Sequence, residues 1–481
     1  MPRFAKLMAL LAAVVAITCG IATAADVTST YSGASANWTT AAWVNVPAGG
    51  GFPNNGGGTT YDAVFNDGFS GDGPLTLDQN ITIQKFTLNV GTLTGTFNLT
   101  TNDMLHDTGG RMSGTGITNA NAGIQIDGYL NVFDTRTINV AGSSSFTGDA
   151  GAKSGNLYWN NAATLNNSGT FDAGWSLNFN NNIGANLGSS DSFGTFNNSG
   201  TFTRSVGTGT TTVNIPFNNS HIVTVQAGTL LLNGGGMETG SFQAASGATL
   251  NFGGSGTTLA AGSSLSGPGT TIISGTVSVT GPAVTYSGGG TLQVTGILNG
   301  AGTLTATAPV ELFAGTMAGG GITNTNGGLS IDGYPDSLDT RTLNNGGSAS
   351  FTGVAIDQFG YFYLYNGAIL NNSGTFDSGW SLNFNNNIVP NGTTGTFNNT
   401  GTFTRSVGTG TTTVSVPFNN SHIVTVQAGT LLLNGGGTET GSFQAASGAT
   451  LNFGGSGTTL AAGSSLSGPG TTIISGTVSV T

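Results

Sequence analysis

The sequence predicts an all-β protein whose short strands stack into a β-solenoid rod. Three observations support this prediction. Apolar residues make up 37 % of the chain and recur at every second position, which is the spacing of a half-buried strand. Clusters of Gly and Asn-Asn return about every 20 residues, and one long block of the chain is written twice. Each turn of a solenoid contacts only its neighbours, so a block can be duplicated without building a new core.

The alternation is clear in "HIVTVQAGTLLLNGG", which begins at His221. Val223 and Val225 are expected to face inward from one strand, and Leu230 and Leu232 from the next. Each predicted strand is about 3–6 residues long and is bounded by turn-forming residues. No stretch of the chain after the N-terminal segment has the apolar spacing of an amphipathic helix. We therefore expect two or three short strands in each turn.

The duplication is long and nearly exact. "NNSHIVTVQAGTLLLNGGG" occupies residues 218–236 and returns at residues 419–437, 201 positions later. Upstream, the stretch that begins at Asn166 matches the stretch that begins at Asn371, with an offset of 205. We interpret the repeated unit as a block of about ten turns. At about 20 residues a turn, the whole rod is expected to have about 22 turns and a length on the order of 100 Å.

The N-terminal region differs from the repeats. Residues 1–24 predict a secretory signal peptide, because Arg3 and Lys6 precede an apolar run that ends at the small residues Ala22-Thr23-Ala24. Residues 25–82 are rich in aromatic residues and Pro, and we expect them to cap the exposed sheet edge at this end.

The remaining chain forms two solenoid blocks, residues 83–280 and residues 281–481. The second block stops at Thr481, which corresponds to Thr280 in the middle of the repeated pattern. We therefore expect the chain to be a fragment of a longer protein, or to have lost a C-terminal cap and an anchoring region.

Composition excludes several classes of function. Charged residues are only 6 % of the chain, and the formal net charge is −11. Without Arg3 and Lys6, the 9 basic residues of the chain fall to 7, against 20 acidic ones. Such a chain has no basic surface for a nucleic-acid backbone, and the mature part has no membrane-spanning segment. The only cysteine, Cys19, lies in the predicted signal peptide, so the mature chain has no disulfide.

The motifs of the repeated block resemble a known family. "TVQAGTLLLNGG", at residues 224–235, resembles the autotransporter-associated β-strand repeat. Together with "LDTRTL", "FNNTGTF" and "SGPGTTIISGTV", it is similar to long extracellular repeat proteins of bacteria, many of which have a sorting signal of the PEP-CTERM type. The resemblance implies a right-handed β-helix-like fold and a secreted or cell-surface, extracellular location. It implies no particular activity.

Six aspartates, three in each block, are candidates for the acid and base of a polysaccharide hydrolase: Asp127, Asp134 and Asp172, with their copies Asp332, Asp339 and Asp377. A catalytic site is normally built once, and these residues occur in both blocks. Asp is also common in turns. We therefore favour structural roles, with ion pairs between Asp134 and Arg136 and between Asp339 and Arg341.

The sequence gives little support for a lyase site, a calcium-binding site or a catalytic histidine. A polysaccharide lyase needs a basic residue beside bound calcium, and Lys85 and Lys153 have no acidic cluster near them in the sequence. "GGSGTT" at Gly253 has Thr where a calcium-binding nonapeptide has Asp. His221 has no nucleophile or acid around it. We expect neither a metal nor a cofactor.

Two residue patterns remain. "NNS" or "NNT" recurs at the same place in successive units, and these asparagines are expected to form structural amide ladders along the stack. The best candidates for a ligand surface are aromatic, namely Tyr158, Trp159 and the alternating residues of "GYFYLYNG", Tyr361, Tyr363 and Tyr365. Alternation places these three tyrosines on one strand face, where we expect a platform for sugar rings; the alternative left open is an outer strand face that a loop covers.

The sequence therefore favours a secreted or surface-attached rod with a structural or adhesive role. We expect polysaccharide or other cell-surface components as partners, bound by many weak contacts. The chain is not predicted to be an enzyme. Two alternatives remain open at this point, a carbohydrate-active β-helix enzyme that uses the aspartates and an inert spacer that binds nothing.

Overall fold

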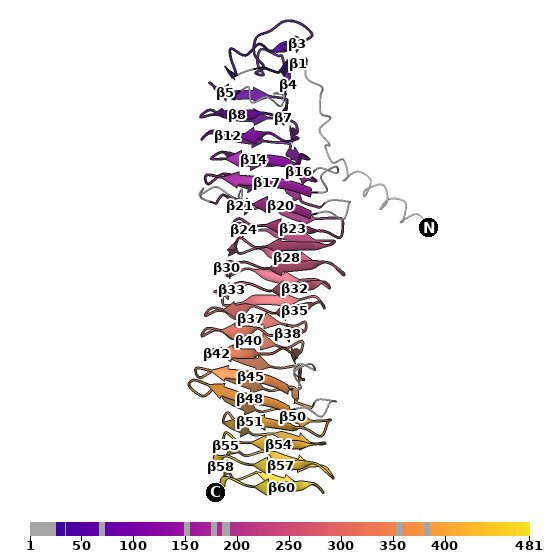
Figure 1. Ribbon diagram of the computed structural model, residues 1–481, viewed down its shortest axis with the longest axis vertical. Helices are drawn as coiled ribbons and strands as arrows, with labels where there is room; N and C mark the ends of the chain where they lie inside the picture. The colour runs from indigo at the N-terminus through magenta and orange to yellow at the C-terminus, as the bar shows by residue number, and fades with distance from the viewer. Residues whose placement is uncertain are drawn as a thin grey trace, which may run out of the picture.

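The computed structural model describes residues 26–33, 35–66, 73–148, 154–174, 180–184, 193–352, 359–379 and 385–481. The predicted signal peptide lies outside these residues. Within them the chain forms 61 strands and no helix. The strands stack along one axis into a rod, with β1 near one end and β60 at the other (Figure 1). The predicted all-β solenoid is confirmed.

The rod has three faces, each formed by one sheet. The first sheet contains, in stacking order, β3 (Val44–Val46), β1 (Val27–Tyr31), β4 (Tyr61–Asn66), β7 (Lys85–Val90), β10 (Leu105–Asp107), β13 (Ile124–Ile126), β16 (Ser143–Phe146), β19 (Thr170–Asp172), β22 (Thr201–Arg204), β25 (Ile222–Val225), β28 (Ser241–Ala244), β31 (Ser264–Ser266), β34 (Val284–Ser287), β37 (Thr303–Ala306), β40 (Ile322–Thr325), β43 (Thr342–Asn345), β46 (Ile369–Asn372), β49 (Thr396–Asn399), β52 (Phe418–Asn420), β55 (Gly437–Glu439), β58 (Ser456–Leu460) and β61 (Thr477–Val480).

The second sheet contains β2 (Ala36–Asn37), β5 (Leu75–Leu77), β8 (Thr92–Gly95), β11 (Arg111–Met112), β14 (Leu130–Asp134), β17 (Ser154–Asn160), β20 (Asn180–Gly184), β23 (Thr210–Val213), β26 (Thr229–Leu232), β29 (Thr249–Phe252), β32 (Thr270–Ile273), β35 (Thr291–Val294), β38 (Val310–Leu312), β41 (Leu329–Ile331), β44 (Ser348–Phe351), β47 (Thr375–Asp377), β50 (Thr402–Arg405), β53 (Ile423–Val426), β56 (Ser442–Ala445) and β59 (Ser465–Ser467).

The third sheet contains β6 (Ile81–Ile83), β9 (Leu99–Thr101), β12 (Ile117–Ala120), β15 (Thr137–Val140), β18 (Thr164–Asn167), β21 (Thr195–Asn198), β24 (Phe217–Asn219), β27 (Gly236–Glu238), β30 (Ser255–Leu259), β33 (Thr276–Val279), β36 (Ile297–Asn299), β39 (Thr316–Ala318), β42 (Asp336–Asp339), β45 (Phe359–Tyr365), β48 (Asn385–Asn391), β51 (Thr411–Val414), β54 (Thr430–Leu433), β57 (Thr450–Phe453) and β60 (Thr471–Ile474).

From β4 onward, each described turn of the solenoid contributes one strand to each sheet. β25, β26 and β27 form one turn, and they pair in parallel with β28, β29 and β30 of the next. The turn length varies because the corners differ in length. Ile222 pairs with Ser241, 19 positions on, whereas Thr164 pairs with Thr195, 31 positions on. Strand pairing runs on without a break past residue 280, so the two predicted blocks form one continuous stack.

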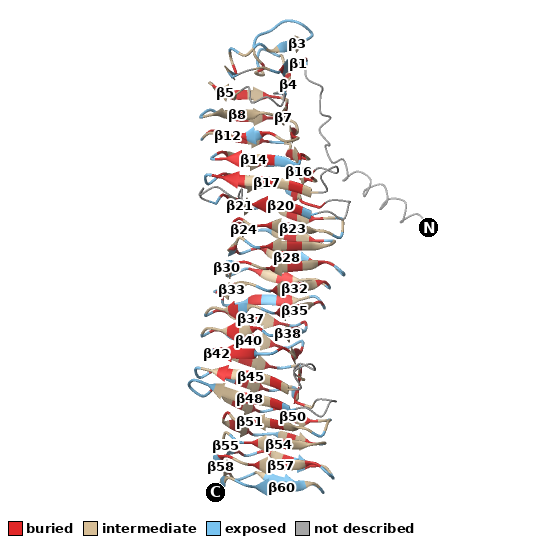
Figure 2. Ribbon diagram, viewed as in Figure 1, coloured by how far each residue is buried: buried red, intermediate tan, exposed pale blue. Residues whose placement is uncertain are grey.

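The core fills the interior of the rod. Strand residues alternate between buried and partly exposed, as Figure 2 shows, because successive side chains of a strand point to opposite faces. Phenylalanines of successive turns stack on one another inside. The rings of Phe171 and Phe202 lie 5.8 Å apart and nearly parallel, and those of Phe196 and Phe217 lie 5.3 Å apart. The packing of each turn therefore depends on the turns above and below it.

The N-terminal region covers one end of this core. Trp38 is fully buried, and its indole nitrogen donates a hydrogen bond of 2.9 Å to the carbonyl of Pro53. β3 lies antiparallel along β1, so the first parallel strand of the sheet does not present a bare edge. These contacts are those expected of a capping region.

Four arginines close the corners of the rod from inside. Arg136, Arg204, Arg341 and Arg405 are all buried, and their guanidinium groups donate mainly to backbone carbonyls. The predicted ion pair between Asp134 and Arg136 is therefore wrong, as is that between Asp339 and Arg341. Thr135 has φ 64° and Thr340 has φ 61°, and this left-handed corner separates each aspartate from the arginine that follows it.

Two amide ladders run along each block, and they confirm the structural role predicted for the repeated asparagines. The outer ladder of the first block joins five side chains, each donating to the one before it over 2.9 Å: Asn119, Asn139, Asn166, Asn197 and Asn218. The equivalent ladder of the second block comprises Asn324, Asn344, Asn371, Asn398 and Asn419. An inner ladder is fully buried and runs in the opposite sense, from Asn167 through Asn198 to Asn219.

Replacement of Asn198 by Ala is expected to lower the free energy of unfolding by about 1–3 kcal/mol. The buried amide of Asn198 donates to Asn219 and to two carbonyls and accepts from Asn167, so these partners lose bonds that water cannot replace. Its outer neighbour Asn197 is partly exposed, and Asn197→Ala is the matched control with a loss below about 1 kcal/mol. Urea denaturation measures both. Equal losses would contradict the special role of the inner ladder.

The duplicated block is not a whole number of turns. β13 and its copy β41 are twenty-eight strands apart, which is nine turns of three strands and one strand more. The same shift separates β25 from β53, so every element of the second block lies one sheet further round the rod than its copy. The block is therefore slightly shorter than the ten turns predicted, and its two copies face different sides.

Candidate functional site

The first pair of candidate aspartates lies at the end of a strand in each block. Asp127 follows β13. Its carboxylate lies 2.9 Å from His106 Nε2 and accepts a hydrogen bond of 3.1 Å from the side-chain amide of Gln125. Its copy Asp332 follows β41 and accepts 3.1 Å from Ser330 Oγ. Burial raises the pKa of Asp332, and the nearby carboxylate of Glu311 raises it further. Both groups are bonded within their own strand or to the adjacent strand.

The second pair closes a corner. Asp134 ends β14 and contacts Arg111, while Thr135 and Asn161 donate to it at 2.9 and 2.7 Å. Burial alone would raise the pKa of Asp134, but the hydrogen bonds from these neighbours and the charge of Arg111 outweigh it and lower the pKa. Asp339 accepts from Thr340 and Asn366, both at 2.8 Å, in the same arrangement.

The third pair stabilises a turn. Asp172 ends β19. Its carboxylate accepts a hydrogen bond of 2.8 Å from the backbone nitrogen of Gly174 and one of 2.5 Å from Ser205 Oγ. Asp377 accepts from Gly379 and Ser406 over the same distances. In both blocks the carboxylate ties its own turn to the turn that follows.

The three aspartates of a block are not brought into one groove. Asp127 and Asp172 end strands of the first sheet that are two rungs apart, about 10 Å at the usual strand spacing. Asp134 lies at the far end of β14, on the second sheet. A glycosidase needs two carboxyl groups that face each other across the scissile bond. Each aspartate here is instead held by local donors at a separate corner.

The three predicted tyrosines do lie together. Tyr361, Tyr363 and Tyr365 point outward from β45 of the third sheet, and all three are partly exposed. The rings of Tyr361 and Tyr363 are 5.7 Å apart at an angle of 12°, and those of Tyr363 and Tyr365 are 5.7 Å apart at 33°. Burial raises the pKa of Tyr363, and the neighbouring tyrosines raise it further.

The cluster is larger than the sequence indicated. Phe359 lies 5.3 Å from Tyr361, and Tyr334 lies 5.6 Å from Phe359, with 40 % of its surface exposed. We call these five residues the aromatic platform: Tyr334, Phe359, Tyr361, Tyr363 and Tyr365. The alternation that selected the tyrosines extends to Phe359, whereas Tyr334 precedes β42 and reaches the platform only because turns stack.

Polar groups border the aromatic platform on the following turn. Asn387 pairs with Tyr361 and Asn391 with Tyr365, and the Asn391 amide donates 3.2 Å to the hydroxyl of Tyr365. On the preceding turn, Asp339 pairs with Tyr365. The surface thus combines apolar ring area with uncharged donors and acceptors and one carboxylate.

The described residues of the first block form no equivalent platform. The positions of Tyr361, Tyr363 and Tyr365 are occupied there by Asn156, Tyr158 and Asn160 of β17. Trp159, which the sequence suggested as a surface residue, is fully buried, and its ring lies 5.3 Å from that of Phe133. Trp159 is buried because side chains alternate along a strand, so Trp159 and its neighbour Tyr158 point to opposite faces. The blocks differ most in sequence at residues 149–156 and 357–361; of these, residues 149–153, 357 and 358 lie outside the described residues.

Other classes of site have little support in the described residues. Among them no group of three or more His, Cys, Asp or Glu side chains is placed to hold a metal ion. In the same part of the chain no helix is long and apolar enough to span a membrane. Of the six arginines and lysines described, four are buried in corners, which leaves Lys85 and Arg111 as basic groups nearer the surface. No protein-family model, curated protein or solved structure matches the chain.

Proposed function

We propose that the protein is an extracellular β-solenoid rod with a structural or adhesive role, and that the aromatic platform is its binding site for polysaccharide. The observation that supports this most is the row of outward tyrosines on β45, three on one strand face with two further aromatic rings beside them. Exposed clusters of this kind on soluble proteins usually mark interaction surfaces.

The chemistry of the platform suits a sugar chain. Aromatic rings pack against the apolar faces of sugar rings, while the phenol hydroxyls and the amides of Asn387 and Asn391 bond to sugar hydroxyls. The row follows β45 and therefore crosses the rod, so one rod contacts a short length of the polymer. Firm attachment then comes from many rods on one surface, through effective concentration.

The proposal does not include catalysis, because the six aspartates lie at separate corners and have structural partners. The spacer alternative differs from the proposal in one measurable respect, since a spacer has no ligand. Both alternatives are outcomes of the experiment that follows.

Replacement of Tyr361, Tyr363 and Tyr365 by Ser is expected to weaken polysaccharide binding at least about tenfold, because each aromatic contact contributes roughly 0.5–1.5 kcal/mol. The measurement is a binding screen of the full chain against immobilised polysaccharides and glycans, with released sugar assayed on the same samples. Tyr158→Ser, in the first block, is the matched control and leaves binding unchanged.

A gain-of-function variant sharpens the test. Asn156→Tyr places a second outward tyrosine on β17 beside Tyr158, and we expect it to add binding capacity. Retention of wild-type binding by the triple Ser variant would refute the platform. Binding by neither protein supports the spacer, and sugar release that is lost on Asp134→Asn or Asp339→Asn supports the enzyme.

A further inference from the structure

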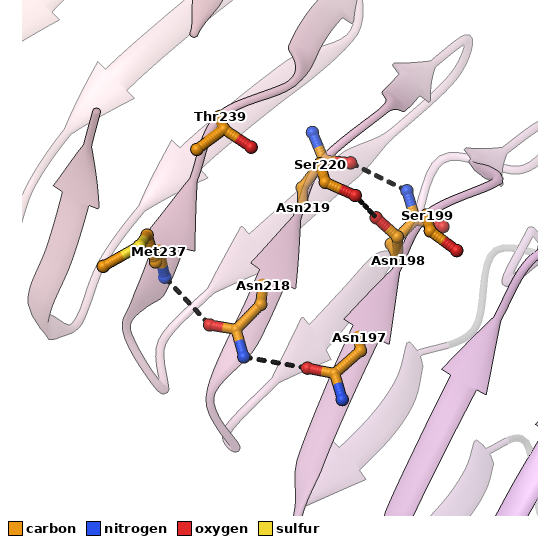
Figure 3. Close-up of a pocket in the computed structure, with 8 residues that line it drawn as sticks. All are labelled: Asn197, Asn198, Ser199, Asn218, Asn219, Ser220, Met237 and Thr239. Carbon is orange, nitrogen blue, oxygen red and sulfur yellow. Dashed lines mark hydrogen bonds between the residues drawn. The ribbon is translucent and has the colours of Figure 1, made fainter. Parts of the chain in front are cut away.

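A second uncharged surface lies away from the aromatic platform. In the first block, a shallow groove of about 490 Å³ runs along the rod past the ends of β21, β24 and β27 (Figure 3). One wall is the outer amide column, with Asn197, Asn218 and the exposed Met237. The other is a hydroxyl column that comprises Ser199, Ser220 and Thr239. We call this surface the amide groove.

The groove has unused hydrogen-bonding capacity. The side-chain amide of Asn218 donates a hydrogen bond of 2.9 Å to Asn197, and its oxygen accepts one of 2.9 Å from the backbone nitrogen of Met237 (Figure 3). A side-chain amide has two N–H groups and two acceptor lone pairs. The ladder uses one of each, so one donor and one acceptor remain on each rung. Ser220 donates 3.3 Å to the carbonyl of Asn198 and keeps its oxygen lone pairs.

The shape and charge of the groove select the class of ligand. None of the described residues that line it is charged, and the chain as a whole has a formal charge of −11, which disfavours anionic polymers. The donors and acceptors repeat along the rod axis at the strand spacing of about 4.8 Å. A linear, neutral, hydroxyl-rich polymer that lies along the rod matches this pattern.

The same two columns recur in the second block on another face. Asn419 donates 2.9 Å to Asn398, and Asn419 accepts 3.0 Å from the backbone nitrogen of Thr438. Thr400 and Ser421 occupy the hydroxyl column. In the first block these strands belong to the third sheet, whereas their copies β49 and β52 belong to the first sheet. The two surfaces therefore point to different sides of the rod.

We propose that each block binds one chain of a neutral polysaccharide in its amide groove, so that one rod joins two polymer chains. The one-sheet shift of the duplicated block is what separates the two sites. If the two copies shared a face, one straight polymer would bind both. On different faces they bind different chains, and the rod becomes a cross-linker.

The test uses the full chain with Tyr361, Tyr363 and Tyr365 replaced by Ser, so that the aromatic platform does not contribute. The probe is hydroxyethyl cellulose, an uncharged glucan, and the readouts are retardation of the protein in gels that contain it and light scattering of the mixture. Ser220→Glu and Ser421→Glu each place a carboxylate in one groove at an exposed position. Ser274→Glu adds the same charge outside both grooves and is the control.

We expect the parent to be retarded and to raise the scattering of the glucan. Either single variant removes the rise in scattering but keeps part of the retardation, and the double variant binds at least about tenfold more weakly, the loss of one to two hydrogen bonds. Carboxymethyl cellulose, the anionic counterpart, is expected to retard the parent less. A parent that is not retarded, or a double variant that matches the Ser274→Glu control, would overturn the inference without bearing on the aromatic platform.

Discussion

The free energy of unfolding of the rod is expected to fall by several kcal/mol between about pH 5 and about pH 8.5. Four carboxyl groups are buried in the described residues with raised pKa values, Asp107, Glu238, Asp336 and Glu439. Burial raises the pKa of Asp107 and of Asp336 to about 7 and that of Glu439 to about 8. Burial also raises the pKa of Glu238, the copy of Glu439, well above its usual range.

The sign of the effect follows from proton binding. In the unfolded chain these groups lose their protons near pH 4, whereas in the folded rod they keep them up to about pH 7–8. Between those limits the folded state binds more protons, so each rise in pH favours unfolding. Each unit of pKa difference corresponds to about 1.4 kcal/mol. Asp134 has a lowered pKa, so its contribution is lost only below about pH 4 and lies outside this window.

Substitutions can assign the effect to particular groups. The first block has Asn131 at the position of Asp336, so Asp336→Asn reproduces a residue that the fold already accepts. Asp336→Asn and Glu439→Gln are each expected to flatten the dependence of the melting temperature on pH. Melting curves by circular dichroism at several pH values measure this. A wild-type melting temperature that rises toward pH 8.5, or a dependence unchanged in both variants, would contradict the prediction.

Much of the fold could be predicted because the relevant physics is local. Val223 and Val225 alternate with polar residues within one strand, so their burial could be predicted without knowing the rest of the chain. The repetition of similar turns also predicted that the turns stack. The order of strands around the rod could not be predicted in the same way. Corners vary from turn to turn, and one strand more or less in the repeated block moves its copy to another face. The number of strands in the repeated block is known only from the pairing of the strands in the structure.

The candidate site shows the same division. One strand carries Tyr361, Tyr363 and Tyr365, so the alternation of side chains along a strand was enough to predict their common face. Tyr334 belongs to the previous turn, and its place beside Phe359 depends on the register between turns. The arginines were misassigned because a spacing of two implies a shared face only within one strand. At Thr135 the backbone turns with φ 64°, and Arg136 enters the interior while Asp134 stays at the corner.

The buried arginines lead to the second large prediction. Arg136→Met is expected to lower the free energy of unfolding by about 3–5 kcal/mol, the usual cost of breaking a buried charged network. The guanidinium group donates 2.7 Å to Thr118 Oγ1 and 3.1 Å to the carbonyls of Ser113 and Phe97. It makes longer contacts to Gly95 and Ile117, so it ties the corners of three successive turns. Without it, these carbonyls are buried and lack donors.

Among the described residues the side chain has no carboxylate partner, and burial lowers the pKa of Arg136 to about 10, so it remains charged at neutral pH. Its role therefore depends on the planar fork of donors as well as on charge. Arg136→Lys keeps the charge with fewer donors in a different geometry, and we expect it to lose a substantial part of the stability. Arg341→Met removes the same arrangement from the second block, where the guanidinium donates 2.8 Å to Thr323 and 2.9 Å to Ala318.

Arg111 is the control, because its side chain is 44 % exposed and its partner Asp134, which is only 8 % exposed, keeps hydrogen bonds from Thr135 and Asn161. Arg111→Met is expected to cost about 1–2 kcal/mol, less than Arg136→Met. Hydrogen exchange separates a local effect from a global one. Since each turn contacts only its neighbours, Arg136→Met should speed exchange in β8 to β15 and leave β53 to β57 unchanged. Equal stability of the Arg136→Lys variant and the wild type would show that charge alone, and not the fork of hydrogen bonds, holds the corner.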